Sequence, residues 1–321
     1  MNRELTGYLS RVEVAMVASL VHEALFYRTA DDYRAGTVPF VERALGRDEP
    51  VLVAVPGPRI DLLAAALGAG AAQVRFLDMT SAGRNPGRII PWVLHAFLDE
   101  HAGRRVRIVG EPIWAGRSVD EYPACVQHEA LINVTFAGQV ASILCPYDAA
   151  ALPDGVLHDA ACTHPVLVDA QARTESMRYT DPDDVVAAFN QPFAEPAPQT
   201  PTLDFDAPSL PLVRDFVAFY AERAGISDRR VDDLQLAVNE LASNAVVHGG
   251  GAGQVRVWPG DGQLICEVRD RGKAEGPLAG LVPPAPESLG GRGLVLVNYL
   301  CDLVRIHTGP EGTAVRAYLD L

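Results

Sequence analysis

The segment LQLAVNELASNAVVHGG, residues 234–250, decides the fold of the second half of the chain. Its apolar residues recur at alternating three- and four-residue steps, which predicts an amphipathic helix with one buried stripe. Glu240 and Asn244 are four residues apart, so they share one face beside that stripe, and His248 lies one turn further on. A carboxylate and an amide at the edge of a core are costly to desolvate unless something binds them.

Three further motifs follow this segment in order. Asp270-Arg271-Gly272 ends an apolar run that predicts a strand, Gly290-Gly291-Arg292-Gly293 opens a second apolar helix, and Gly312-Thr313 begins a last strand. Their order and spacing resemble the N, G1, G2 and terminal Gly-Thr boxes of the GHKL ATPase superfamily over about residues 201–321. Within that superfamily, ELASNAVVHG and GGRGLVLVNYL are most similar to the anti-sigma-factor serine kinases.

This resemblance implies an α+β fold, the two-layer sandwich of the GHKL or histidine-kinase-like ATPases, with a largely antiparallel sheet and helices on one face. It also implies ATP and Mg²⁺ as cofactors. Asn244 would offer a side-chain oxygen to Mg²⁺, a hard cation, and Asp270 would accept a hydrogen bond from the adenine amino group. Glu240 would be the catalytic base that accepts the proton of an attacking serine hydroxyl.

Glycines would let the backbone approach the phosphates at the start of the second helix, where Arg292 adds a fixed cation. Thr313 would help through a water, and His248 fits a phosphate contact as well as a plain helix end. The ATP-binding residues implied are Asn244, His248, Asp270, Gly272, Gly291, Arg292, Gly293 and Thr313. The loop 273–290, with four prolines, stands where the superfamily keeps its ATP lid.

Composition narrows the class of protein. The 321 residues, 48 % apolar and 21 % charged, suffice for two soluble domains. The formal charge of −14 argues against a nucleic-acid partner. No apolar run is long enough for a membrane span, the start lacks a signal-peptide core, and the five cysteines form no regular framework, so we expect reduced thiols and a cytoplasmic protein. Lys273 is the only lysine, which excludes a P-loop.

The first half of the chain alternates strand and helix patterns. Apolar runs at 51–56, 74–79, 105–112 and 140–148 predict strands, and helical patterns at about 59–69, 87–101 and 122–137 separate them. A helix is also expected at 31–46, and another around Val14 to Leu20. This alternation predicts an α/β domain with a parallel sheet covered by helices on both faces.

Four short motifs in this half are His22-Glu23-Ala24, GEPIWAGR, CPYD and THP at 163–165. They resemble the MEDS domain, a RecA-like sensory module thought to perceive small, often hydrocarbon-derived ligands, over about residues 10–170. The resemblance implies a sensory pocket formed by His22, Glu111, Cys145, Tyr147 and His164. Purely structural roles are equally consistent with these residues, since Cys145 can be a small core residue. We place no nucleotide here, because the first strand–helix loop lacks both the glycine pattern and a lysine.

Two Cys–His pairs raise the question of zinc. Cys125 and His128 are three residues apart, and Cys162 and His164 lie close together. Neither pair has the tight spacing of a zinc knuckle, which favours core cysteines and surface histidines.

A proline-rich polar segment, 171–202, predicts a helical tail and then a semi-rigid linker. We therefore expect a MEDS-like sensory domain at 1–172, a linker at 173–200 and a GHKL ATPase-type domain at 201–321. The segment contains no histidine, which argues against a histidine kinase, since that class needs a phospho-accepting histidine on a helix before its ATPase domain.

These patterns predict a cytoplasmic regulator in which a small-molecule sensor controls an anti-sigma serine kinase. Its expected partners are a sigma factor and a STAS-type anti-anti-sigma protein, and a homodimer is left open. The alternatives are an ATP-binding switch or scaffold without phosphotransfer, an atypical sensor histidine kinase, and a phosphatase activator built on the same fold.

Overall fold

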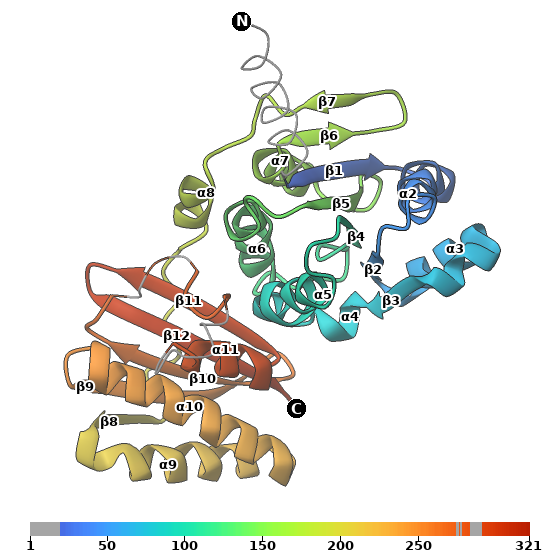
Figure 1. Ribbon diagram of the computed structural model, residues 1–321. Coiled ribbons are helices and arrows are strands. Elements are labelled where there is room, and N and C mark those ends of the chain that lie inside the picture. Colours follow the sequence, from blue (N-terminus) through green and yellow to red (C-terminus); the bar gives the residue numbers. More distant parts are fainter. Residues whose placement is uncertain (1–19, 274–275, 277, 283–290) are drawn as a thin grey trace, which may run out of the picture. The chain divides into compact units, whose positions relative to one another are not determined.

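Figure 1 shows the computed structural model, which describes residues 20–273, 276, 278–282 and 291–321. The chain divides into two compact units. The first contains the described residues up to Gly83 together with Leu94–Val185, and the second contains Arg84–Val93 together with Val186–Leu321. The helix expected around Val14 falls outside the described residues, as does most of the loop 273–290.

The first unit alternates strands and helices along the chain. Its main elements are β1 (Val21–Tyr27), α2 (Ala30–Leu45), β2 (Val51–Val55), α3 (Gly57–Leu67), β3 (Val74–Asp78), α4 (Met79–Ala82), α5 (Ala96–Glu100), β4 (Val106–Gly110), α6 (Tyr122–Thr135), β5 (Ala141–Asp148), α7 (Asp154–Thr163), β6 (Val166–Val168), β7 (Arg173–Glu175) and α8 (Pro182–Ala188). A short 3₁₀ turn at Gly68–Gln73 completes the first unit. A 3₁₀ turn at Pro86–Arg88 and most of a π-helical stretch at Ile89–His95 follow α4 in the chain but belong to the second unit.

The strands of the first unit form one seven-stranded sheet in the order β3-β2-β4-β5-β1-β6-β7. All neighbours pair in parallel except β6 and β7, which are antiparallel. Every residue of β2 is buried, as expected for a parallel strand covered on both faces. Residues of α2 and α3 pack on one face, against Val51, Val53 and Val55. The predicted α/β architecture with helices on both faces is confirmed.

The strands predicted at 51–56, 74–79, 105–112 and 140–148 correspond to β2, β3, β4 and β5 within one or two residues. No strand is predicted at β1 from the sequence, because His22 and Glu23 interrupt its apolar run. Both side chains are nevertheless buried. Residues 173–175, assigned to the linker from the sequence, pair with β6 as β7.

The second unit runs strand, helix, helix, hairpin, helix, hairpin. Its elements are β8 (Thr202–Asp206), a 3₁₀ turn (Ala207–Ser209), α9 (Leu210–Arg223), α10 (Asp228–His248), β9 (Ala252–Gly260), β10 (Gln263–Asp270), α11 (Gly293–Leu300), β11 (Leu303–Gly309) and β12 (Gly312–Asp320). The five strands pair in the order β11-β12-β10-β9-β8, and each pair is antiparallel.

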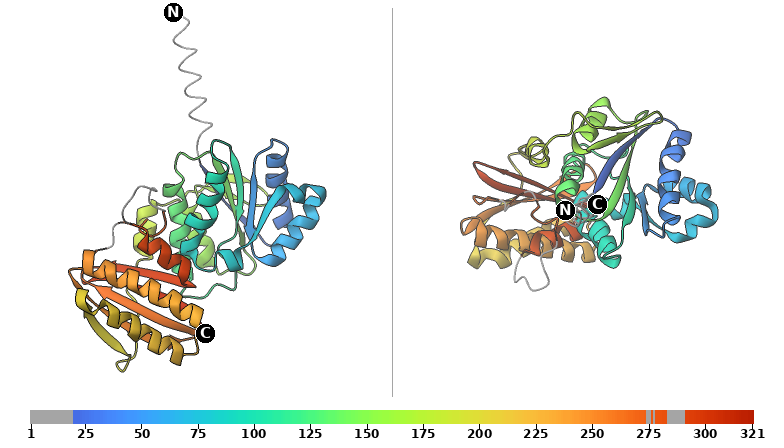
Figure 2. Two further views of the ribbon diagram at one scale, coloured as in Figure 1. Left: turned by 60° about the horizontal axis from the view of Figure 1, so that its bottom comes forward. Right: turned by 45° about the horizontal axis from the view of Figure 1, so that its top comes forward.

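Helices α9, α10 and α11 share one core with the sheet of the second unit. Leu234, Val238, Leu241 and Ala245, from the predicted stripe of α10, are all buried there. In Figures 1 and 2, α9 and α10 lie side by side on one face of the five-stranded sheet. The predicted two-layer α+β sandwich with helices on one face is therefore confirmed.

The described part of the chain contains no helix that combines the length and the apolar character needed to cross a membrane.

Candidate functional site

A cavity of about 450 Å³ opens in the second unit. It is bounded by α10, by the end of β10, by the start of α11 and by β11 and β12. Its lining residues are Leu241, Asn244, His248, Gly249, Val268, Asp270, Gly272, Lys273, Ala279, Gly280, Gly291, Gly293, Leu294, Ile306, Thr313 and Val315. Seven of the nine residues implicated by sequence in ATP binding or catalysis line it, the exceptions being Glu240 and Arg292.

Helix α10 presents Glu240 and Asn244 to the start of α11. Both are half-buried, beside the buried stripe as predicted. A Cβ atom added to Gly293 would lie 3.0 Å from Oε2 of Glu240 and 3.4 Å from Nδ2 of Asn244, so the first turn of α11 approaches both side chains closely. Among the described residues, neither side chain has a hydrogen-bond partner.

Asp270 ends β10 and is fixed in place by a tight turn. The backbone N–H of Gly272 donates to its Oδ1 over 2.6 Å. The Thr313 hydroxyl in turn donates to the carbonyl of Gly272 over 2.9 Å. No donor among the described residues reaches Oδ2. Burial raises the pKa of Asp270 above its ordinary value, while the Gly272 N–H opposes that rise.

Two glycines make room for Asp270, one beside its side chain and one beside its backbone. A Cβ atom on Gly249 would lie 2.5 Å from Cγ of Asp270. One on Gly312 would lie 2.0 Å from the carbonyl oxygen of Asp270, and Gly312 has a φ of +124°, which side-chain-bearing residues rarely adopt. The sequence motifs contain Gly312 but do not assign Gly249 a role, although its place directly after His248 is a usable signal.

The N-terminus of α11 supplies the remaining polar wall. Gly291 and Gly293 line the cavity, whereas Arg292 is exposed and does not line it. Gly290 lies outside the described residues. Free backbone N–H groups and the helix dipole make such an N-terminus attractive to anions.

The walls of the cavity are largely apolar. Leu241, Val268, Leu294, Ile306 and Val315 line it, which suits a flat aromatic ring. Lys273, the only lysine of the chain, also lines it and was not predicted as a site residue. His248 lines it as well, at the exposed end of α10.

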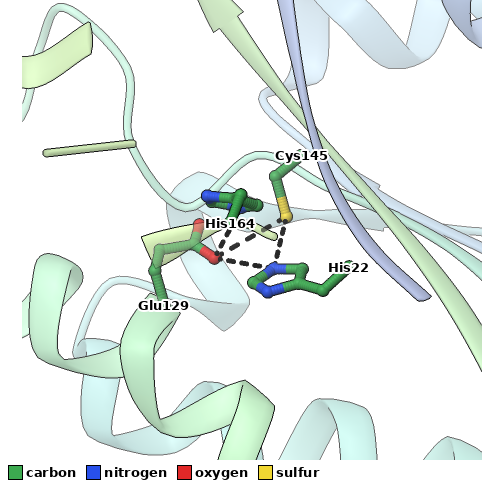
Figure 3. A group of neighbouring side chains, drawn as sticks. All are labelled: His22, Glu129, Cys145 and His164. Atoms are coloured by element: carbon green, nitrogen blue, oxygen red, sulfur yellow. Dashed lines mark hydrogen bonds and ion pairs between the residues drawn. The ribbon is translucent and has the colours of Figure 1, made fainter. Parts of the chain in front are cut away.

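In the first unit, four of the five predicted pocket residues gather around one carboxylate, that of Glu129 on α6. Figure 3 shows His22, Cys145 and His164 pointing toward it. The Nε2 atom of His22 lies 3.2 Å, and that of His164 3.4 Å, from Oε2 of Glu129. The Tyr147 hydroxyl donates to Oε1 over 3.2 Å. We call His22, Glu129, Cys145 and His164 the buried cluster. The sequence gives no indication of Glu129.

Glu111, the fifth predicted pocket residue, belongs to a different set of contacts. Its Oε1 accepts a hydrogen bond from Tyr27 over 3.4 Å, while Oε2 is buried without a partner. Burial raises the pKa of Glu111 to about 8. Tyr27 and His22 are five residues apart on β1 and therefore face opposite sides of the sheet. Because Tyr27 contacts Glu111 and His22 belongs to the buried cluster, Glu111 and the cluster lie on opposite faces of the sheet.

The Cys–His pairs considered for zinc do not form a site of their own. No group of three or more metal-ligating side chains in the described residues includes Cys125, His128 or Cys162. Cys125 is a core residue, as predicted. The prediction of surface histidines is wrong, since His128 and His164 are both buried. The His164 ring packs against His22 and Tyr147, and His128 belongs to the run of buried residues of α6.

Comparison with known families identifies both halves. Residues 21–165 match the model described as MEDS: MEthanogen/methylotroph, DcmR Sensory domain. Residues 203–319 match the model of the histidine kinase-like ATPase domain. The chain combines a MEDS domain with a histidine kinase-like ATPase domain. This assignment implies that the ATPase domain binds ATP.

Among solved structures, the chain is similar to the RsbU and RsbW domains of Rv1364c from Mycobacterium tuberculosis, at 24 % identity and a TM-score of 0.29. The match covers 38 % of this chain and 33 % of that one. We find no match among curated proteins.

Proposed function

We propose that the chain is a signalling regulator whose ATPase domain binds Mg²⁺-ATP in the cavity and acts as an anti-sigma serine kinase. In this proposal it phosphorylates a serine of a STAS-type anti-anti-sigma protein and alternately holds a sigma factor. The MEDS domain senses a small molecule and controls which partner is held. The observation that supports the ATP site is that Asn244, Asp270 and the start of α11, far apart in sequence, meet around one cavity.

The adenine ring fits the end of the cavity near Asp270. Oδ1 is occupied by the Gly272 N–H, so Oδ2 remains to accept a hydrogen bond from the adenine amino group. Gly249 and Gly272 leave space beside this carboxylate. Apolar walls then cover the faces of the ring, and a site built this way favours a base that donates at that edge.

The phosphates belong at the opposite end, between Asn244 and the first turn of α11. Backbone N–H groups of that turn, exposed by Gly291 and Gly293, hold anionic oxygens without a lysine-bearing P-loop. Mg²⁺, when bound, neutralises phosphate charge, and the Asn244 side-chain oxygen is a ligand it accepts. Lys273 supplies a further cation on the cavity wall.

Glu240 is the residue we propose as the general base. Its carboxylate has no hydrogen-bond partner among the described residues, and it lies against Gly293, where the phosphates end. A carboxylate in that place can accept the proton of a serine hydroxyl as it attacks the terminal phosphorus.

One observation favours the second candidate, an ATP-binding switch without phosphotransfer. Glu240 touches the start of α11 but does not line the cavity itself. A switch needs Asn244 and Asp270 for nucleotide binding and would tolerate Glu240→Gln.

The test is transfer from γ-labelled ATP by the full-length protein to a panel of STAS-type proteins from the same organism. We expect acid-stable label on one of them, and at least about a 100-fold slower rate with Glu240→Gln. The exposed Glu222→Gln on α9 is the matched control and should transfer at the wild-type rate. If the Glu240→Gln variant transfers phosphate at the wild-type rate, Glu240 is not the general base.

If no partner becomes labelled, the result favours an ATP-binding switch without phosphotransfer. Acid-labile label on the protein itself would favour a histidine kinase.

A further inference from the structure

The buried cluster concentrates four polar side chains in the interior of the MEDS domain. His22 comes from β1, Glu129 from α6, Cys145 from β5 and His164 from the end of α7. None of the four is more than 3 % exposed. Burying ionisable groups away from water is costly unless they are paired or bind a metal. Some interaction must therefore compensate the desolvation cost of these four side chains.

The outer nitrogens of both imidazole rings are occupied by acceptors. Nδ1 of His164 lies 2.8 Å from the carbonyl oxygen of Ala160. Nδ1 of His22 lies 3.1 Å from Oδ1 of Asn133, whose amide nitrogen donates to the Thr163 carbonyl over 2.8 Å and so fixes the orientation of the amide. Each Nδ1 therefore carries a proton, and in the neutral ring Nε2 presents a lone pair.

Both Nε2 lone pairs point into the cluster, where acceptors outnumber protons. Oε2 of Glu129 stands between the two Nε2 atoms, and the Cys145 thiol carries the only hydrogen that can be donated among these four atoms. Nε2 of His164 is buried without a hydrogen bond. What the four atoms lack is a positive charge at their centre.

Four of the six distances among these atoms, 3.2, 3.4, 3.4 and 3.7 Å, lie near the edge lengths of a tetrahedron around a metal ion. All four lie within 4.8 Å of one another. Nε2 of His22 is 3.4 Å from Sγ of Cys145, and Sγ is 3.7 Å from Oε2 of Glu129. Bonds of about 2.0–2.1 Å to nitrogen or oxygen and about 2.3 Å to sulfur give tetrahedral edges of about 3.3–3.6 Å.

We propose that His22, Glu129, Cys145 and His164 bind one divalent transition-metal ion, with Zn²⁺ the best fit to this donor set. Two imidazoles, one thiolate and one carboxylate are ligands that Zn²⁺ accepts, whereas Mg²⁺ and Ca²⁺ require oxygen. Binding converts the Cys145 thiol to a thiolate and releases one proton. The carboxylate and the thiolate then balance the charge of the ion, which suits a site this deeply buried.

The surroundings of the rings support the same assignment. Metal-binding histidines usually donate their second N–H to a carbonyl or carboxylate, as His164 does to Ala160 and His22 does to the Asn133 amide oxygen. The ligands come from β1, α6, β5 and the end of α7, so the ion would hold together segments far apart in the chain. Metal binding should therefore stabilise the MEDS domain.

The test uses full-length protein stripped of metal and titrated with Zn²⁺ alone, and in parallel with Co²⁺ as a spectroscopic probe. We expect one equivalent to bind, a raised melting temperature, and an absorption band from a Co²⁺–thiolate bond. Cys145→Ser should lose at least about tenfold in affinity and all of that band. Cys162→Ser, a half-buried thiol of α7 outside the cluster, is the matched control and should behave as wild type.

Failure of the wild type to bind either ion, or binding without the thiolate band, would overturn the proposal. Equal affinity in Cys145→Ser and wild type would also overturn it. The band is measured on the wild type, so the test stands even if Cys145→Ser folds poorly. Its outcome is independent of whether the ATPase domain transfers phosphate.

Discussion

The two groups of polar residues in this chain differ in their access to water. In the ATPase domain, Glu240 and Asn244 are half-buried beside an open cavity, without protein hydrogen-bond partners among the described residues. In the MEDS domain, Glu129 and the two histidines are sealed and lie against one another. Water can satisfy the first group when no ligand is bound, whereas only the cluster itself or an ion can satisfy the second.

Because of this difference, we expect substitutions at the cavity to change ligand affinity and substitutions in the buried cluster to change the stability of the fold. Changes at the rim of an open cavity should alter ligand binding while the fold tolerates them. Changes in a sealed cluster, or in the backbone that frames the cavity, should alter the free energy of unfolding. The predictions below test that division, from the largest expected effect to the smallest.

Gly312→Ala should have the largest effect of the substitutions, because the new Cβ would meet the backbone of Asp270, which cannot move away as a flexible side chain can. We expect the ATPase domain to lose more than about 3 kcal/mol of stability. Urea denaturation of the full-length protein measures it, using the transition that Mg²⁺-ATP shifts.

Gly262→Ala is the matched control for Gly312→Ala. Gly262 also has a positive φ, of +72°, but a Cβ atom there would have nothing within 4 Å. It should cost only about 1–2 kcal/mol. Equal losses in the two variants would show that backbone strain, rather than close approach to Asp270, requires the glycine.

Acid should destabilise the metal-free MEDS domain between pH 6.5 and about 4. Burial lowers the pKa of His22, and also that of His128, from 6.5 to about 4. Above pH 6.5 these rings are neutral in both states, but below it the unfolded chain binds protons that the folded domain does not. Stability therefore falls as the pH falls, by on the order of 3 kcal/mol per ring, and the loss is complete below pH 4.

The control for this prediction is His22→Asn. Removing the ring should reduce the dependence of the unfolding free energy on pH between 6.5 and 4 by about half, because His128 remains. An unchanged dependence would mean that His22 is not buried as a neutral ring, and the contrast between the two sites would weaken.

Gly293→Ala should affect affinity and leave stability nearly unchanged. The new Cβ would lie 3.0 Å from Oε2 of Glu240 and 3.4 Å from Nδ2 of Asn244, both at the ends of side chains that can move. It would obstruct the phosphates at the start of α11, so we expect Mg²⁺-ATP affinity to fall about tenfold. Unchanged affinity, measured by calorimetry, would place the phosphates elsewhere.

The same contrast explains which parts of the molecule could be predicted from the sequence. The cavity is built from motifs in which several adjacent residues act together, at a helix face, a strand end and a glycine turn. The residue types of these motifs and their order along the chain can be recognised from the sequence alone. The position of Glu240, against Gly293 but outside the cavity lining, depends on the packing of α11 on α10 and could not be read in this way.

The buried cluster is assembled from single residues on four separate elements, and only the sheet order brings them together. Glu129 lies beside His128 in a stretch of α6 that is buried almost throughout, where no periodic pattern marks one of them as facing the sheet. The sequence does not predict strand β1, because its buried polar residues His22 and Glu23 conceal its apolar pattern. The resemblance groups Glu111 with His22, but Tyr27, which donates to Glu111, lies on the face of β1 opposite to His22.

The most direct measurement for the central claim is calorimetry of Mg²⁺-ATP binding to the full-length wild type, Asn244→Ala and Asp270→Asn. We predict that the wild type binds and that each variant loses at least about tenfold in affinity, because each loses a contact with a charged or donating group. Asn239→Ala, on the same helix with its amide oxygen accepting from Arg214, should bind as the wild type does. No binding by the wild type, or unchanged affinity in both variants, would contradict the claim that this cavity is the ATP site.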